Sequence, residues 1–168
     1  MLVASCRQQP VTAASKVFNS EPEKLSFRYP SNWEPVPAQA KSTIVLLYAR
    51  DGSLATCNVS VVSSDRESAR DFDAAYFTTI LSQIHSDIRI KKAWHRDILG
   101  QAMALVECDF TMAMAERTVP MGSLMMATVR ERKRYMMILN APRDRLPELH
   151  DDFEIMVSTF LLAGTTKN

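Results

Sequence analysis

The sequence predicts an α+β domain built on an antiparallel or mixed sheet with helices packed on its faces. Apolar residues alternate with period two in most hydrophobic segments, and two segments have a helical period instead. The order along the chain is strands, helix, four strands, helix, which is typical of this class. The 168 residues, of which 46% are hydrophobic, are enough for the core of one domain.

The first predicted strand covers residues 25–30. Leu25, Phe27 and Tyr29 alternate there, Pro30 ends the run, and Trp33 supplies a large apolar anchor for the corner that follows. After a connection punctuated by prolines, residues 42–48 are apolar in both phases, which is typical of a strand covered on two sides. A turn at residues 51–52 leads to a strand over 55–63, so residues 42–63 are expected to form a hairpin.

The middle of the chain changes period and then changes back. Residues 68–85 are predicted to form an amphipathic helix, whose apolar positions are Phe72, Tyr76, Ile80 and Ile84. Strand character returns over residues 88–98, and residues 103–115 show the cleanest alternation in the chain. The phase of that strand expected to be exposed carries Glu107, Asp109 and Thr111.

The last third predicts a hairpin and a second helix. Strands over residues 124–129 and 135–140 are joined by a charged turn. The helix that follows is expected to end at Gly164. Its core-facing positions are Leu146, Leu149, Phe153, Met156, Val157, Phe160 and Leu161.

Three parts of the chain are distinguished by composition. Residues 1–24 are expected to be a flexible leader, residues 25–163 the domain, and residues 164–168 a tail. Within the leader, residues 2–6 have the branched, small, small, Cys order of a bacterial lipoprotein cleavage site, so Cys6 is a candidate for lipidation. The alternative is a plain disordered tail in which the match is accidental.

The charge balance excludes some classes of partner. Twenty basic and nineteen acidic residues give a formal net charge of +1, so no global field directs the protein to nucleic acid or an anionic membrane. Charged residues also interrupt every apolar run before the length of about 18 residues that a bilayer requires.

Three stretches resemble the PsbP family of photosystem II extrinsic proteins and their bacterial and plastid relatives. They are residues 29–35 (Tyr-Pro-Ser-Asn-Trp-Glu-Pro), residues 58–62 (Asn-Val-Ser-Val-Val) and the segment from Ala141-Pro142 to Phe160, in the family's order and spacing. The resemblance spans about residues 25 to 163. The chain lacks the longer inserted loops of the plant photosystem proteins, and its leader shows no clear match to their docking segment.

The resemblance implies an α/β/α sandwich with a central antiparallel sheet, which Ran-binding Mog proteins and chaperones of secreted toxins share. Members of the family are mostly binding or assembly factors without catalysis. Cyanobacterial members are lipoproteins acylated where Cys6 stands here. The resemblance also implies a divalent cation, Ca²⁺, Mn²⁺ or Zn²⁺, as the candidate cofactor, and photosystem II association if the source is photosynthetic.

Few residue patterns suggest chemistry. The histidines His85, His95 and His150 are scattered over different elements without the spacing of a structural metal site. His150 and Asp151, with Asp152 beside them, are weak candidates for a divalent cation, although adjacent helical residues point about 100° apart and favour a solvated polar face. Glu107 and Asp109 share a strand face and could form an acid pair, for which a solvated face is again the simpler interpretation.

The cysteines and methionines are expected mainly in the core. Cys57 and Cys108 each share the apolar phase of a strand, which favours two free buried thiols; a disulfide between them is the alternative. The clustered methionines favour core filling, then a groove for an apolar peptide or helix, then a soft-metal site for Cu(I). They are Met112, Met114, Met121, Met125, Met126, Met136 and Met137.

The charged turn provides the one basic concentration. Arg130, Arg132, Lys133 and Arg134 are candidates for docking a protein or a lipid headgroup, and a solvated turn is the default. The absence of aromatic residues among them argues against binding single-stranded nucleic acid.

These observations predict a non-enzymatic, monomeric accessory or assembly protein outside the cytoplasm, on the periplasmic or thylakoid lumen side. It would bind a protein partner at a membrane surface. The alternative is a cytoplasmic chaperone or adaptor of the same fold, which would hold an apolar client segment against the Met-rich sheet. Kinases, dinucleotide enzymes and α/β-hydrolases are disfavoured, because only four glycines occur in the chain and phosphate cradles and nucleophile elbows require them. A small hydrolase or metal-dependent enzyme is the second, less favoured alternative.

Overall fold

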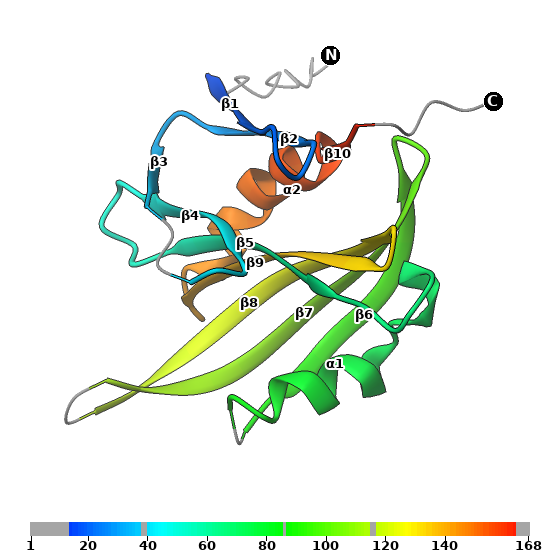
Figure 1. Ribbon diagram of the computed structural model, residues 1–168. Helices are drawn as coiled ribbons and strands as arrows, with labels where there is room; N and C mark the ends of the chain where they lie inside the picture. The colour runs from blue at the N-terminus through cyan, green and yellow to red at the C-terminus, as the bar shows by residue number, and fades with distance from the viewer. Residues whose placement is uncertain (1–13, 38–39, 86, 115–116, 164–168) are drawn as a thin grey trace, which may run out of the picture.

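The computed structural model describes residues 14–37, 40–85, 87–114 and 117–163. Two antiparallel sheets form within these ranges, and the larger has the strand order β3-β4-β5-β9-β8-β7-β6 (Figure 1). Its strands are β3 (Trp33–Val36), β4 (Thr43–Ala49), β5 (Thr56–Ser63), β6 (Arg89–Ile98), β7 (Gln101–Met114), β8 (Arg117–Arg130) and β9 (Lys133–Pro142). The smaller sheet has the order β1-β2-β10, with β1 (Ser15–Ser20), β2 (Leu25–Pro30) and β10 (Leu161–Leu162).

Helices cover the large sheet on both faces. The 3₁₀ turn η1 (Ala69–Asp71) and helix α1 (Ala74–Leu81) lie on one face, which we call the α1 face. The 3₁₀ turn η2 (Leu146–Leu149), helix α2 (His150–Ser158) and the small sheet lie on the other, which we call the α2 face (Figure 1). The predicted α+β class, an α/β/α sandwich around a central antiparallel sheet, is therefore confirmed.

The central strands are buried on both faces, and this corrects one expectation. On β7, Met103 and Leu105 belong to the core on the α2 face, while Ala104 and Val106 belong to the core on the α1 face. The phase expected to be exposed instead carries Asp109, which is 8% exposed. Period two is present, but the covering segment buries Asp109 and leaves Glu107 and Thr111 half-buried.

Trp33 anchors the corner after β2, as predicted. It is fully buried, and its indole Nε1 donates a hydrogen bond to Asp152 Oδ2 at 2.6 Å. The connection expected after Pro30 is itself partly a strand, because residues 33–36 pair with β4 as β3. Pro35 is tolerated there since β3 is the edge of the sheet.

The predicted flexible leader is wrong for its last part. Ser15–Ser20 form β1, which pairs antiparallel with β2 and places the Phe18 ring 5.3 Å from that of Phe27. Order therefore begins before residue 25. Residues 1–13, with the lipidation candidate Cys6, lie outside the described residues, as does the tail at 164–168.

Both predicted helices are shorter than their periodicity indicated. Residues 68–85 divide into η1, which has a capping box between Ser68 and Asp71, and α1, whose N-cap is Asp73. Helix α2 ends at Ser158, and β10 follows it before the expected end at Gly164, which lies outside the described residues. The two caps explain the division, since each starts a new helical segment.

The β7–β8 hairpin extends beyond its neighbours. β6 pairs with β7 only as far as Asp109, and β9 pairs with β8 only as far as Met121. Residues 111–114 and 117–120, which we call the arm, therefore form a two-stranded ribbon that projects from the sheet (Figure 1). The strand predicted at residues 124–129 is correct in place, but β8 begins seven residues earlier, at Arg117.

Candidate functional site

The acid pair proposed from the sequence lies on the α2 face of β7. Glu107 and Asp109 share that face because they are two residues apart on one strand. Glu107 is opposite Leu124 on β8, and Asp109 is opposite Gly122. Gly122 leaves room for Leu146 of η2, since a Cβ there would lie 2.6 Å from Leu146 Cδ2. The carboxylates thus lie beneath the segment that leads into α2.

Glu107 is paired with a cation. A bulge in β6 between Ile90 and Lys92 disturbs the register at Lys91, whose Nζ reaches Glu107 Oε1 at 2.6 Å. This hydrogen bond raises the pKa of Lys91 above its usual value. The other oxygen, Glu107 Oε2, lies 4.0 Å from His150 Nε2. Glu107 thus lies between Lys91 of β6 and His150 at the start of α2.

Asp109 is more deeply buried than Glu107 and is less completely satisfied. Arg143, which follows β9, brings Nε to 3.5 Å from Asp109 Oδ2. The second oxygen, Oδ1, has no hydrogen-bond partner among the described residues. Asp109 is therefore held by one long ion pair inside a covered site.

The three polar residues at the start of α2 point to different places. His150 faces Glu107, whereas Asp152 accepts the hydrogen bond of Trp33 on the way to the small sheet. Burial raises the pKa of Asp152 above the ordinary value, more than the Trp33 hydrogen bond lowers it. Asp151 is exposed. The described part of the chain contains no group of three or more His, Cys, Asp or Glu residues arranged to hold a metal ion, so the cation site at His150 and Asp151 has no support.

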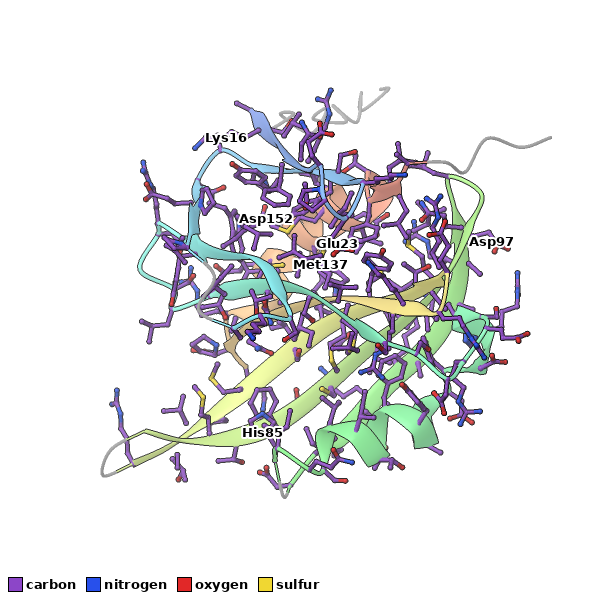
Figure 2. The ribbon with its side chains drawn as sticks, in the orientation of Figure 1. Lys16, Glu23, His85, Asp97, Met137 and Asp152 are labelled. Carbon is purple, nitrogen blue, oxygen red and sulfur yellow. The ribbon has the colours of Figure 1, made fainter. Side chains whose placement is uncertain are left out.

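The other two histidines serve local contacts. The His85 ring lies 4.1 Å from that of Phe110 at the base of the arm. His95 Nε2 lies 3.1 Å from the Phe72 carbonyl oxygen and so ties β6 to the end of η1. Figure 2 shows His85 on the side of the sheet away from Asp152.

Most of the basic turn between β8 and β9 is engaged inside the protein. Arg130 donates to the Ala163 carbonyl, and Arg134 donates to the Tyr76 hydroxyl on α1. Lys133 Nζ lies 3.0 Å from the Glu23 carboxylate in the turn between β1 and β2. Arg132 is exposed, and no carboxylate in the described ranges lies within ion-pair distance of it. Three of the four residues predicted for docking thus hold the turn against three other segments.

Cys57 and Cys108 are both free and buried. Cys57 belongs to the core on the α2 face and Cys108 to the core on the α1 face, so the sheet separates them and the alternative of a disulfide is wrong. Burial raises the pKa of the Cys57 thiol well above its ordinary value and that of Cys108 to about 12. Neither is a reactive thiolate.

The methionines fill the core. Met121, Met125, Met126, Met136 and Met137 are all at most 7% exposed. Met137 lies in the interior of the α2 face in Figure 2. The groove and the copper site both require accessible sulfur, so core filling is the interpretation that holds for these five. Met112 is half-buried on the arm, and the Met114 side chain lies outside the described part.

Two polar contacts were not predicted from the sequence. Asp87 accepts hydrogen bonds from the Thr111 backbone N–H, at 3.0 Å, and from the Thr111 hydroxyl, and these bonds lower the pKa of Asp87. Arg143 reaches Asp109 from beyond the end of β9. Both join segments more than 20 residues apart, so no local pattern marks them. A sequence signal for these contacts would have been that β7 and β8 are longer than the strands beside them. The strand predicted at residues 124–129 was too short to show this.

None of the helices in the described ranges is long and apolar enough to cross a membrane.

Searches with sequence find no family model and no curated protein that match this chain. Solved structures do match. Cyanobacterial PsbP (CyanoP) from Synechocystis sp. PCC 6803 is 19% identical, with a TM-score of 0.64 over 92% of this chain and 96% of that one. The Ran-binding protein Mog1p of Saccharomyces cerevisiae is 6% identical, with a TM-score of 0.66 over 92% and 98%. LpqN of Mycobacterium tuberculosis, involved in cell envelope biogenesis, is 8% identical, with a TM-score of 0.50 over 89% and 84%.

At these identities the likeness concerns the fold, and one fold hosts unrelated functions. The coverage of nearly the whole chain in each pair places every layer of the sandwich within the match. The order of layers agrees with the architecture that the three sequence stretches indicated. The chain has the PsbP/Mog-like fold.

Proposed function

We propose that this chain is a non-enzymatic accessory protein that binds a protein partner at a membrane surface. The main support for the proposal is one observation: the charged residues that the sequence suggested as candidates for chemistry are paired within the protein. Glu107 is held by Lys91, Asp109 by Arg143, and most of the basic turn by contacts within the protein. Such pairs position segments of a fold, whereas catalytic groups converge on a cleft that a substrate can enter.

The structural neighbours support the same general role. Mog1p is a Ran-binding protein, and CyanoP is a PsbP relative. The alternative is a cytoplasmic chaperone that holds a client against the Met-rich sheet. It would need these methionines at the surface, but they lie beneath α1 and α2. An accessory protein of this fold would instead use its edges and loops.

The membrane part of the proposal depends on Cys6. A lipid on this cysteine would place the domain outside the cytoplasm and against a membrane, and only a short segment separates Cys6 from β1 at Ser15. Mass spectrometry of the protein isolated from its native membranes tests this. A diacylglycerol on the Cys6 sulfur is expected, and an intact N-terminal Met would contradict it.

The protein partner is tested by photo-crosslinking in the native cell. A photoreactive residue is placed at Val17, Leu54, Ile84 or Leu99, which are large apolar side chains between 53% and 73% exposed on different elements. A discrete crosslinked protein at one or two of these positions is expected, together with no turnover of small-molecule substrates by the purified chain. Association with photosystem II, in a photosynthetic source, would appear as one of its subunits in the crosslink. The absence of crosslinks at all four positions would contradict the proposal.

A further inference from the structure

Within the described ranges the two sheets have four edge strands, and three of these are protected against pairing with another chain. β10 has only two residues. β3 has four residues, and Pro35, at a position that faces outward, lacks the N–H that a further strand would bind. β6 has a bulge at Lys91 and three further basic side chains, which are those of Arg89, Lys92 and Arg96. Bulges and basic residues both discourage pairing at an edge.

β1 is the edge strand without such protection. Its six residues contain no proline and one charged side chain, that of Lys16, and they pair with β2 in one continuous register. Val17, near the centre of the strand, is 53% exposed. β1 therefore presents a regular edge of low charge, with an exposed apolar residue, at the margin of the small sheet (Figure 1).

The hydrogen bonds of β2 show which backbone groups of β1 point outward. Ser31 N donates to the Ala14 carbonyl oxygen at 2.8 Å, so residue 14 bonds to the β2 strand and every second residue after it does the same. Arg28, which lies opposite Val17, agrees with this alternation, because its N–H donates away from β1 to Thr159 Oγ1. The outward backbone groups of β1 are therefore those of Ser15, Val17 and Asn19. No described segment pairs with them.

We propose that β1 pairs antiparallel with β1 of a second copy of this chain, about a two-fold axis at Val17. Val17 would then lie opposite the partner's Val17, and Ser15 would lie opposite the partner's Asn19. All three outward positions would exchange backbone hydrogen bonds, and the two small sheets would become one continuous sheet. This inference goes beyond the proposed function, and it differs from the monomer that the sequence predicts.

The residues of β1 favour a second copy over a strand of another protein. In the register about Val17, Lys16 lies opposite the partner's Phe18, so no like charges face each other and the two exposed valines cover each other. An axis at Lys16 would instead place two lysines opposite each other. A foreign strand would find only one charged side chain by which β1 could select it, whereas a two-fold interface needs nothing beyond β1 itself.

Disulfide trapping tests the axis directly. Opposite residues of a hydrogen-bonded pair have Cα atoms about 5.5 Å apart, a distance that a disulfide spans. Val17→Cys is made together with Cys6→Ser, which removes the one cysteine outside the described residues; Cys57 and Cys108 are buried. Mild oxidation is expected to give a covalent dimer. Leu54→Cys in the same background is the control, since Leu54 is 66% exposed and lies on another part of the surface, and it is expected to stay monomeric.

Sedimentation equilibrium on the full chain measures the dimer without a crosslink. Val17→Lys is expected to raise the dissociation constant at least about tenfold, because it places two lysines opposite each other, and Leu54→Lys to leave it unchanged. Amide exchange on the unaltered chain needs no variant, and exchange of the Val17 N–H is expected to slow as the protein concentration rises.

Four results would overturn the proposal: a monomer at every concentration, a dimer that Val17→Lys leaves intact, equal trapping of the two cysteine variants, or a Val17 N–H that is protected in the monomer by another segment of the chain. A photo-crosslink from Val17 to a different protein, without a dimer, would support the proposed function and reject this pairing.

Discussion

The two faces of the large sheet are closed in different ways. On the α2 face, η2, α2 and the small sheet cover a core that includes Trp33, Phe27 and Phe160, and polar residues are sealed at its margin. On the α1 face, one short helix and a 3₁₀ turn cover a smaller cluster around Phe72 and Phe77. The larger core on the α2 face predicts that more of the stability comes from that face and that the α1 face opens more easily.

The largest effect is expected from removing an aromatic anchor on each face. Trp33→Ala empties a fully buried site and leaves Asp152 without its donor, so the free energy of unfolding should fall by about 3–5 kcal/mol. Phe77→Ala should cost less, because α1 can move or detach while the rest of the domain stays folded. Urea unfolding followed by circular dichroism measures both. Equal losses would mean that the two faces form one cooperative unit.

A smaller effect is expected from two neighbouring residues on β8 that face opposite ways. Gly122→Ala places a Cβ against the buried Leu146 side chain and should cost about 1–3 kcal/mol by overpacking the α2 face. Ser123→Ala removes the hydroxyl that donates to Leu139 O at 3.2 Å and should cost about 0.5–1.5 kcal/mol. Thermal and urea unfolding of the two variants compare the packing of the two faces at adjacent positions of β8. A neutral Gly122→Ala would show that η2 is loosely packed on the sheet.

The sequence predicted the elements whose own residues determine them. The strands near 25–30 and 55–63 follow from local alternation and turn residues. β1 and β3 were missed, because adjacent Val17 and Phe18 break the alternation in β1 and two prolines obscure β3. β1 and β3 form by pairing with β2 and β4, and rules that consider only neighbouring residues do not include this pairing.

The candidate site shows the same limit. A shared strand face for Glu107 and Asp109 follows from their spacing, and the structure has it. Their burial does not follow, since the covering segment begins at Arg143, more than 30 residues later. Lys91 and Asp87 also act on residues that are distant in sequence, at Glu107 and Thr111. Long-range docking, rather than composition, decides which charged residues become part of the interior.

A smaller effect is expected at two ion pairs that adjacent residues of β6 form with segments on opposite faces of the sheet. Arg96 reaches Glu154 of α2 with two nitrogen atoms, each 2.8 Å from a carboxylate oxygen, and Asp97 accepts from Arg70 of η1 at 2.8 and 3.0 Å. All four side chains are more than a third exposed, so each pair should contribute at most about 1 kcal/mol. Double-mutant cycles with alanine are expected to give the larger coupling for Arg96 and Glu154. A larger coupling at Arg70 and Asp97 would place more of the rigidity on the α1 face.

The smallest effect is expected in the pH dependence, where Asp152 on the α2 face and Asp87 at the edge of the arm differ in sign. Burial raises the folded-state pKa of Asp152, so its stabilisation is greatest at low pH and is lost as the pH rises from the ordinary value of 3.8 through the raised pKa. Bonds from Thr111 lower the pKa of Asp87, so its stabilisation is present above 3.8 and is lost as the pH falls through the lowered value. Asp152→Asn should therefore gain stability relative to the unaltered protein toward neutral pH, whereas Asp87→Asn should lose it. Urea unfolding between acidic and neutral pH measures how the free energy of unfolding of each variant, relative to the unaltered protein, changes with pH. Changes of the same sign in the two variants would show that Asp152 is more solvated than its place beneath Trp33 indicates.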